Sequence, residues 1–302
     1  MKKNRGMIVA FLTPAVAFFC LIFLYPIVRT VGMSLFNING LIDPISEWNF
    51  VGVQNYITLV NTELFRNSMW NLLRIWIIGG IAVMIISLLL AVILTSGIRF
   101  TKFARAVIYL PNIVSAVALA TMWLQAVYSP KFGILKNFFT KIGAENLANI
   151  QWLSGDNKFY ALLIAYCFGI VGYHMLIFIS GIERISPEYY ESATIDGANK
   201  IQQFRYITFP LLKGVLRTNL IMWSISSMSF FVWSQLFSSL GMDTSTVTPM
   251  VYMYVQLFGS GAQGITERNS GLGAAIGVVL CTMTIIIFWI LNRSLKDQDV
   301  EF

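Results

Sequence analysis

The chain has 302 residues, of which 57% are apolar and only 12% are charged, and it carries a formal net charge of +7. This charge content is about half that of an ordinary soluble domain, which excludes a water-soluble globular protein and indicates a membrane protein. The three cysteines, Cys20, Cys167 and Cys281, all lie inside apolar runs. The sequence therefore implies neither a disulfide framework nor a metal site.

Six apolar runs are long enough to cross the hydrocarbon core of a bilayer, about 30 Å thick, as helices. In chain order they cover residues 7–28, 75–95, 106–128, 159–182, 218–240 and 271–292. The first run is too long for a secretory signal and lacks a cleavage motif, so we interpret it as a retained span. The predicted fold class is an all-α membrane protein with six transmembrane helices, which form a single domain over residues 1–302.

The basic residues are distributed unevenly between the two faces of this predicted bundle. With the N-terminus in the cytoplasm, most Lys and Arg residues fall on the cytoplasmic side, especially at the N-terminus and in the loop 183–217. This is the positive-inside bias, and it places both termini in the cytoplasm. The four lysines of the external loop 129–158 run against the bias. The net charge therefore reports topology and does not indicate a nucleic-acid partner.

The six runs contain no Asp, Glu, Lys or Arg. Ion-coupled transporters ordinarily place such groups at membrane depth, and the chain also lacks a P-loop and the common hydrolase motifs. These absences disfavour two alternatives, an ATPase-independent channel or secondary transporter and an intramembrane enzyme. His174 has no second metal-ligand type at helical spacing, so we expect a hydrogen-bonded interior histidine rather than a ligand. Energy for active transport would have to come from another chain.

A polar block, PEYYESATIDGANKIQQFRYITFP at residues 187–210, separates the fourth and fifth runs. Ser186 suits the N-cap of a helix, Pro187 suits its first position, and Gly197 suits its C-terminal end. The block therefore predicts a short helix over residues 187–196, about 15 Å long. Pro210 marks where the next membrane helix begins.

The spacing within this block resembles the E-A-A-x3-G-x9-I-x-L-P signature of permease subunits from binding-protein-dependent ABC importers. The matching positions are Glu191, Ser192, Ala193, Gly197, Ile207, Phe209 and Pro210. Ser192 and Phe209 depart from the signature, and both changes are mild. Shorter stretches at 50–56, 249–252 and 271–275 are similar to the carbohydrate-uptake group of the maltose and glycerol-phosphate type, in its first permease partner.

The resemblance implies an assembly of separate chains in the inner or plasma membrane of a bacterial or archaeal cell. A second homologous permease would complete the pathway, two ABC ATPase subunits would bind ATP and Mg²⁺, and an extracellular solute-binding protein would deliver a carbohydrate. This chain would hold no cofactor and would contact membrane lipid. The block would contain the coupling helix between spans four and five, with ATPase-coupling residues Glu191, Ser192, Ala193, Gly197, Ile207 and Pro210.

The fifth run carries one stripe of aromatic and hydroxyl side chains, which consists of Trp223, Ser226, Ser227, Phe230 and Ser234. On the fourth run, Tyr166 and Tyr173 lie seven residues apart, and Gly169 and Gly172 allow close approach of a neighbouring helix. Neutral hydroxyls beside aromatic faces suit a carbohydrate and suit an anion poorly. By resemblance to permeases of the maltose type, in which the same two helices contact substrate, the expected substrate-binding set is Tyr173, Trp223, Ser226, Ser227 and Phe230. Helix packing is an equally good interpretation of each of them.

The predicted function is a transmembrane permease subunit of an ATP-driven ABC importer for a sugar or oligosaccharide, forming half of the translocation pathway. The chain would not itself be an enzyme, because ATP hydrolysis would belong to the partner ATPases. An ABC permease for another solute, such as glycerol phosphate or an amino acid, remains an alternative.

Overall fold

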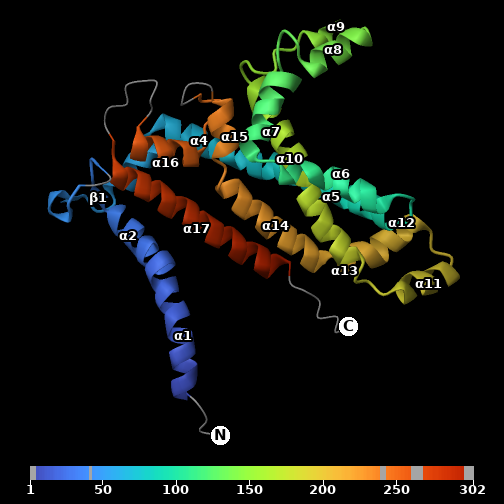
Figure 1. Ribbon diagram of the computed structural model, residues 1–302, viewed down its shortest axis with the longest axis horizontal. Coiled ribbons are helices and arrows are strands. Elements are labelled where there is room, and N and C mark those ends of the chain that lie inside the picture. Colours follow the sequence, from blue (N-terminus) through green and yellow to red (C-terminus); the bar gives the residue numbers. More distant parts are fainter. Residues whose placement is uncertain (1–4, 41–42, 239–242, 260–267, 296–302) are drawn as a thin grey trace. The chain divides into compact units, whose positions relative to one another are not determined.

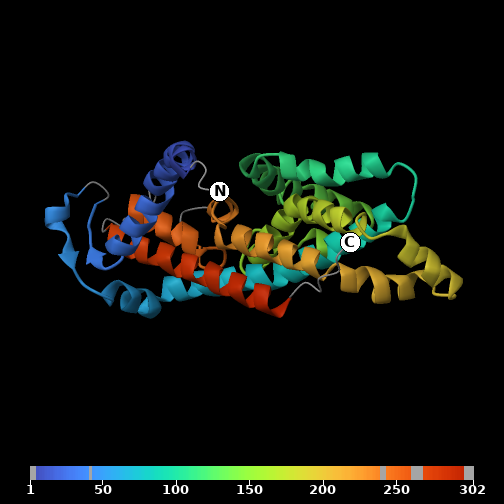
Figure 2. The same cartoon turned by 90° about the horizontal axis from the view of Figure 1, so that it is seen from below.

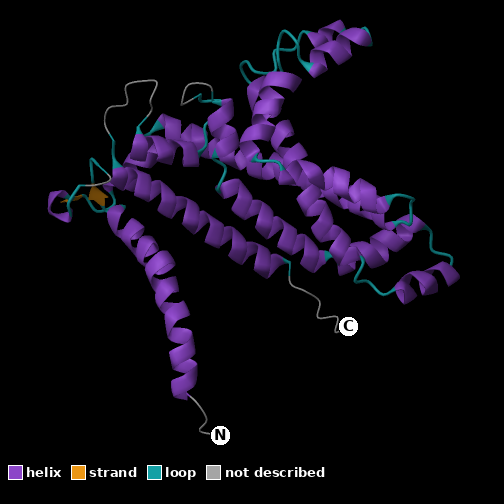
Figure 3. Ribbon diagram, viewed as in Figure 1, coloured by secondary structure: helices purple, strands orange, loops and turns teal. Residues whose placement is uncertain are grey.

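A computed structural model describes residues 5–40, 43–238, 243–259 and 268–295, and helices make up most of this part of the chain (Figures 1 and 3). The chain divides into two compact units. The first contains residues 1–66 and 252–282, and the second contains residues 67–251 and 283–302. The second unit holds both groups of residues that the sequence predicts to be functional.

The first unit begins with a long apolar helix. Its elements are α1 (Arg5–Phe19), the π-helical turn η1 (Cys20–Leu24), α2 (Tyr25–Met33), β1 (Phe36–Asn37), η2 (Ile45–Glu47), β2 (Asn49–Phe50) and α3 (Gln54–Asn61). Asn55 donates from Nδ2 to the carbonyls of Ser34 and Phe36 at 2.9 Å, and Tyr56 donates to the Ser34 hydroxyl at 2.7 Å. These bonds give a structural role to the last two residues of the 50–56 stretch.

The second unit contains most of the remaining helices. They are α4 (Glu63–Arg74), η3 (Ile75–Gly79), α5 (Gly80–Thr95), α6 (Thr101–Ile113), α7 (Ala116–Met122), η4 (Trp123–Val127), α8 (Ile134–Lys141), α9 (Glu145–Ala148), α10 (Asn157–Ile182), α11 (Pro187–Ile195), α12 (Lys200–Gln203), η5 (Phe204–Thr208), α13 (Phe209–Leu211), α14 (Lys213–Met228) and α15 (Val232–Phe237). Two further helices, α16 (Pro249–Phe258) and α17 (Ser270–Ser294), contain residues of both units, and so does α4, whose residues 63–66 belong to the first unit.

Four helices in the described ranges are long and apolar enough to cross a membrane: Ala10–Met33, Glu63–Thr95, Asn157–Ile182 and Ser270–Ser294. They cover most of the predicted spans 7–28, 75–95, 159–182 and 271–292. The predicted span 106–128 is instead a pair of helices bent by 97°. The predicted span 218–240 contains most of α14 and all of α15, with an interruption after Met228, and its residues 239–240 lie outside the described residues. The total of six spans therefore stays a prediction.

Helix α10 lies at the centre of the second unit, between α5 and α6 (Figure 2). Gly172 makes this packing possible, because a Cβ atom there would collide with the backbone of Ile108 and Tyr109 in α6. Gly169 likewise leaves room for Leu119, which would lie 3.0 Å from a Cβ atom. Small residues at a helix crossing allow this close approach, as the sequence predicted for this pair.

Candidate functional site

The predicted coupling helix and the external loop lie at opposite ends of α10. This helix has 26 residues, which corresponds to about 39 Å at 1.5 Å per residue. Helices α8 and α9 precede its first residue, and α11 follows its last (Figure 1). If α10 crosses the bilayer, α11 lies on the face opposite to α8 and α9.

Helix α11 forms where the sequence predicts it, over Pro187–Ile195 with Ser186 at the N-cap position. The Ser186 side chain makes no capping hydrogen bond, so Pro187 is the local feature that favours the helix start. Gly197 has φ +81°. The amides of Gly197 and Ala198 donate to the carbonyls of Thr194 and Ala193 at 3.1 and 2.8 Å. This is a Schellman ending, which confirms the predicted role of Gly197.

Side chains brace α11 against the segment that follows it. Tyr190 and Thr208 share a hydrogen bond between hydroxyl groups at 2.9 Å. Gln203, which is 4% exposed, donates from Nε2 to the Thr194 hydroxyl at 2.9 Å and to the Ala198 carbonyl at 3.3 Å. These contacts join α11 to the segment 198–208 that follows it.

The proposed coupling residues differ in exposure. Glu191, Ser192 and Gly197 are exposed, whereas Ala193, Ile207 and Pro210 are half-buried. A side chain at Gly197 would meet nothing within 4 Å in this chain. Ile195 and Ile201 are 87% and 78% exposed. The block 187–210 therefore presents both a small residue and large apolar side chains on its exposed surface.

An ion pair that the sequence analysis did not predict lies close to this block. Arg105 of α6 contacts Glu183, just after the end of α10, at 2.8 Å. Its guanidinium also donates to the Leu94 carbonyl at 3.4 Å. Arg105 therefore links the ends of α5, α6 and α10. Its place just before an apolar run could have suggested a position at a helix end, but the distance in sequence to Glu183 hides the pairing.

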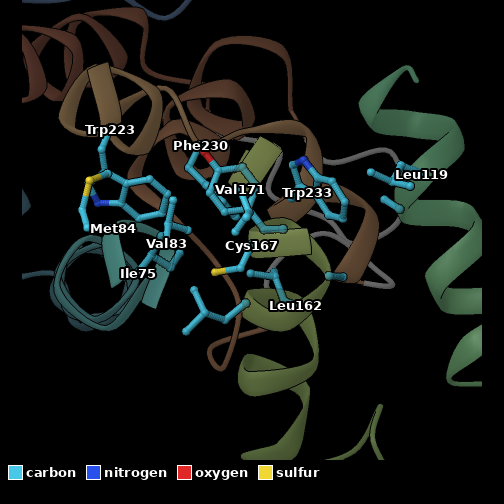
Figure 4. Packing of buried hydrophobic residues seen from close by; sticks show 14 of the residues in the cluster. Ile75, Val83, Met84, Leu119, Leu162, Cys167, Val171, Trp223, Phe230 and Trp233 are labelled. Carbon is cyan, nitrogen blue, oxygen red and sulfur yellow. The ribbon is translucent and has the colours of Figure 1, made fainter. Parts of the chain in front are cut away.

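Trp223, from the proposed substrate set, is buried at 1% exposure against the start of α5 (Figure 4). Its indole Nε1 donates to the Trp76 carbonyl at 2.9 Å. Its ring occupies the space that Cβ atoms at Gly79 and Gly80 would need, within 2.9 and 2.7 Å. Reciprocally, Trp76 Nε1 donates to the Ser224 hydroxyl at 2.9 Å. Trp223 thus holds α14 tightly to α5 in this conformation.

The other members of the set divide into buried and half-buried groups. Phe230 is 3% exposed and meets the Tyr166 ring edge-on at a centroid distance of 4.7 Å. Ser227 is fully buried, and its hydroxyl donates to the Trp223 carbonyl at 2.7 Å within α14. Tyr173 and Ser226 are half-buried. The structure therefore brings Trp223 and Phe230 together around Tyr166, whose ring lies 5.7 Å from the Trp223 ring.

His174 and Asn219 form a polar pair between α10 and α14. His174 Nδ1 and Asn219 Oδ1 are 2.8 Å apart, and both residues have no exposed surface. Because an amide oxygen only accepts, this bond requires the proton on Nδ1. The pair confirms the predicted interior histidine. In the described part of the chain, no cluster of three His, Cys, Asp or Glu residues could hold a metal ion.

The opposite end of α10 contains a buried polar network that the sequence analysis missed. Lys158 is 7% exposed and contacts Asp243 at 2.6 Å. Burial raises the pKa of Asp243, but hydrogen bonds from Lys158 and Ser245 outweigh this effect, so its pKa lies below its usual value. Asn71 donates from Nδ2 to the carbonyls of Thr244 and Val247 at 2.9 and 3.0 Å. The segment 243–248 is thereby fixed to the core.

The long apolar helices are those of a helical membrane protein, and a braced polar block lies at one end of its central helix. Residues 84–297 match the family described as "binding-protein-dependent transport system inner membrane component". The match covers more than half of the chain. The chain therefore belongs to this family.

Comparisons with individual proteins agree with the family match. A probable ABC transporter permease protein of Pyrococcus horikoshii is 30% identical, with 93% of this chain and 92% of the relative covered. The diacetylchitobiose uptake system permease protein of Streptomyces coelicolor is 26% identical, with 97% and 84% covered. A bacterial alginate ABC transporter, solved in complex with an alginate pentasaccharide-bound periplasmic protein, has a chain of similar fold, with TM-score 0.77, 21% identity and 96% and 94% coverage.

Proposed function

We propose that this chain is one half of the translocation pathway of an ATP-driven importer for a sugar or oligosaccharide. Family membership supports the transport role. The names of the related diacetylchitobiose and alginate transporters support a carbohydrate substrate. The pathway would be completed by a second permease, and two ATPases on the cytoplasmic face would supply ATP and Mg²⁺ chemistry. A solute-binding protein would deliver cargo on the outer face, as the pentasaccharide-bound protein in the alginate complex suggests.

The observation that carries this proposal is the braced, exposed block at residues 187–210. A helix fixed by the Tyr190–Thr208 and Gln203–Thr194 contacts transmits a displacement instead of absorbing it. Its outer surface carries Ile195, which would be solvated in an isolated chain. Seating this surface in an ATPase cleft would bury apolar area and would couple closure of the ATPase dimer to the membrane helices. In this arrangement both termini and the block are cytoplasmic, and all spans form one permease domain.

The proposed substrate residues would act in two groups. Tyr173 and Ser226 are half-buried, so their hydroxyl groups are accessible to a sugar without repacking of the core. Trp223, Ser227 and Phe230 are buried and would shape the wall of the pathway. Truncating Trp223 to Ala would open a cavity that costs about 3–5 kcal/mol, which would mix loss of folding with loss of transport. Ser226→Ala is therefore the sharper probe of substrate contact.

A matched pair of glycine substitutions tests the coupling role. Gly197 and Gly143 both have positive φ, +81° and +75°, and neither would place a Cβ atom within 4 Å of another group. Gly197→Asp and Gly143→Asp therefore impose similar backbone strain, but at opposite ends of α10. In the reconstituted transporter we expect Gly197→Asp to abolish ATP-driven uptake while the chain remains in the membrane. Gly143→Asp should retain most uptake.

The proposed contact between Gly197 and an ATPase requires that Gly197→Asp lower ATP-driven uptake more than Gly143→Asp does. If both variants transport at the wild-type rate, or if both lose uptake equally, close contact between Gly197 and an ATPase is excluded. Uptake is measured with radiolabelled diacetylchitobiose and maltopentaose in proteoliposomes, and membrane insertion is measured by quantitative immunoblotting of the same samples.

A further inference from the structure

A cavity of about 480 Å³ lies on the far side of α10 from α11. One wall consists of the turn that follows η4, at residues 127–130, and the other consists of the segment 148–154. Among the lining side chains are Tyr128, Lys136, Asn149, Gln151, Trp152 and Ser154. The volume falls in the range of small-molecule sites, about 300–1,000 Å³. None of the residues that the sequence predicted for substrate binding or for ATPase coupling lines this cavity.

The aromatic wall of the cavity is anchored to the core of the second unit. Tyr128 is 3% exposed, and its hydroxyl donates to the Ala161 carbonyl of α10 at 3.0 Å. The rings of Tyr128 and Trp152 lie 5.7 Å apart, and Trp123 packs on Tyr128 at 5.2 Å. Trp152 is thus positioned by packing against a fixed partner.

A tight turn at residues 129–133 forms the edge of the cavity opposite to the aromatic wall. A Cβ atom at Gly133 would collide with the backbone of Ser129, so only glycine fits there. The Gly133 amide donates to the Ser129 carbonyl at 2.9 Å. Lys136 donates from Nζ to the Pro130 carbonyl at 2.8 Å, which closes the turn with a side-chain bond. The shape of this edge therefore follows from local hydrogen bonds and does not depend on a bound molecule.

The chemistry of the lining fits an uncharged, hydroxyl-rich ligand. Trp152 is half-buried and offers an aromatic surface, while Asn149, Gln151 and Ser154 are exposed amide and hydroxyl groups. The lining contains no carboxylate, so it offers no charge for a cation. Its single ammonium, on Lys136, already bonds a carbonyl, which makes it a weak anchor for an anion. Stacking on a ring combined with neutral hydrogen-bonding groups is the usual way to hold a saccharide.

We propose that this cavity is an accessory binding site for a neutral oligosaccharide on the face where cargo arrives. The inference rests on the proposed function, which sets the substrate class and places α11 in the cytoplasm. A saccharide held here would lie outside the membrane core, beside the entrance to the pathway. Its main effect would be on capture of cargo and on chain-length preference, and the ATP-driven step itself would not require it.

Protection of an introduced thiol by saccharide tests this site directly. The native cysteines are replaced by serine, and Asn149→Cys or Asn146→Cys is introduced into the full chain within the reconstituted transporter. Both asparagines are exposed in the same segment, but only Asn149 lines the cavity. We expect saturating maltopentaose or diacetylchitobiose to slow maleimide labelling of the Asn149→Cys thiol at least about fivefold. Labelling of the Asn146→Cys thiol should not change.

Substitutions of Trp152 distinguish a saccharide site from simple shielding. In the Asn149→Cys background, Trp152→Ala should remove the protection, and Trp152→Phe should keep it because a phenyl ring still stacks. The proposal would be overturned if neither saccharide slowed labelling of the Asn149→Cys thiol. It would also be overturned if labelling were slowed only when solute-binding protein without bound saccharide was added. ATP-driven uptake is measured on the same proteoliposomes. If neither saccharide protects the Asn149→Cys thiol in the chain that keeps Trp152 while uptake is intact, the accessory site alone is refuted, whereas absence of saccharide uptake by the wild type refutes the proposed function.

Discussion

The two ends of α10 carry irregular segments that are stabilised in different ways. At one end, the segment 243–248 is held by side chains from several helices, including Asn71, Lys158 and Ser234. At the other end, the block 187–210 is braced mainly by its own side chains, and Ile195 and Ile201 stay exposed. The first segment is built into the core, whereas the second leaves large apolar side chains exposed.

This difference follows from how backbone groups are satisfied away from regular helices. The carbonyls of Thr244, Thr246 and Val247 accept side-chain hydrogen bonds from buried donors, because a buried carbonyl without a donor is costly. In the other segment, the Schellman ending at Gly197 satisfies the helix end locally. Local satisfaction leaves the surrounding surface free to meet a partner. We call the end of α10 beside the segment 243–248 the structural end, and the end beside the block 187–210, which carries the proposed coupling helix, the coupling end. Three experiments test whether the two ends differ in this way.

The largest effect is expected for Asn71→Leu at the structural end. Asn71 is 3% exposed, and the variant leaves two carbonyls without their donor. We expect a loss of about 2–4 kcal/mol in the free energy of unfolding. Melting of the detergent-solubilised chain measures it, with Asn146→Leu on an exposed site as the control. Uptake per assembled transporter should stay near the wild-type value. A normal melting temperature would remove the structural role assigned to this network.

A smaller effect on stability but a larger one on transport is expected for Gln203→Leu at the coupling end. The variant loses the hydrogen bonds to Thr194 and Ala198, and this loss should lower the free energy of unfolding by about 1 kcal/mol. Without the brace, α11 should absorb motion, so uptake per ATP hydrolysed should fall several-fold. Parallel assays of uptake and phosphate release measure this ratio, with Gln54→Leu on an exposed site as the control. An unchanged ratio would show that the brace has no part in coupling.

The smallest effect concerns pH and the Lys158–Asp243 pair. The pKa of Asp243 is lowered in the folded chain, so the pair contributes stability above the unfolded pKa of about 3.9. This stability is lost as the pH falls through the still lower folded pKa. The Asp243 side chain is 33% exposed, so solvent screening limits the contribution to about 1 kcal/mol or less.

The variant Asp243→Asn should therefore melt below the wild type at pH 6, and the gap should narrow toward pH 3. Glu191→Gln, which removes an exposed carboxylate at the coupling end, is the control and should show no such gap. A gap of constant size from pH 6 to pH 3 would contradict the role assigned to the charge of Asp243.

The sequence by itself determined the features that depend on neighbouring residues. The apolar runs predicted the long helices, because a bilayer requires continuous apolar surface. Pro187 and Gly197 predicted the limits of α11 to within one residue, because capping depends on local backbone geometry. Gly169 and Gly172 predicted close helix contact, because a missing Cβ atom is visible in sequence.

Only the tertiary structure decided which distant residues meet. Trp223 in the predicted substrate stripe has the same local pattern whether it faces a pathway or a neighbour, and its burial against Gly79 and Gly80 appears only after α14 packs on α5. The Lys158–Asp243 pair joins residues 85 positions apart, and the sequence around either residue does not indicate its partner. Helix ends are determined by neighbouring residues through local backbone geometry, whereas contacts between helices depend on how the chain is folded in three dimensions.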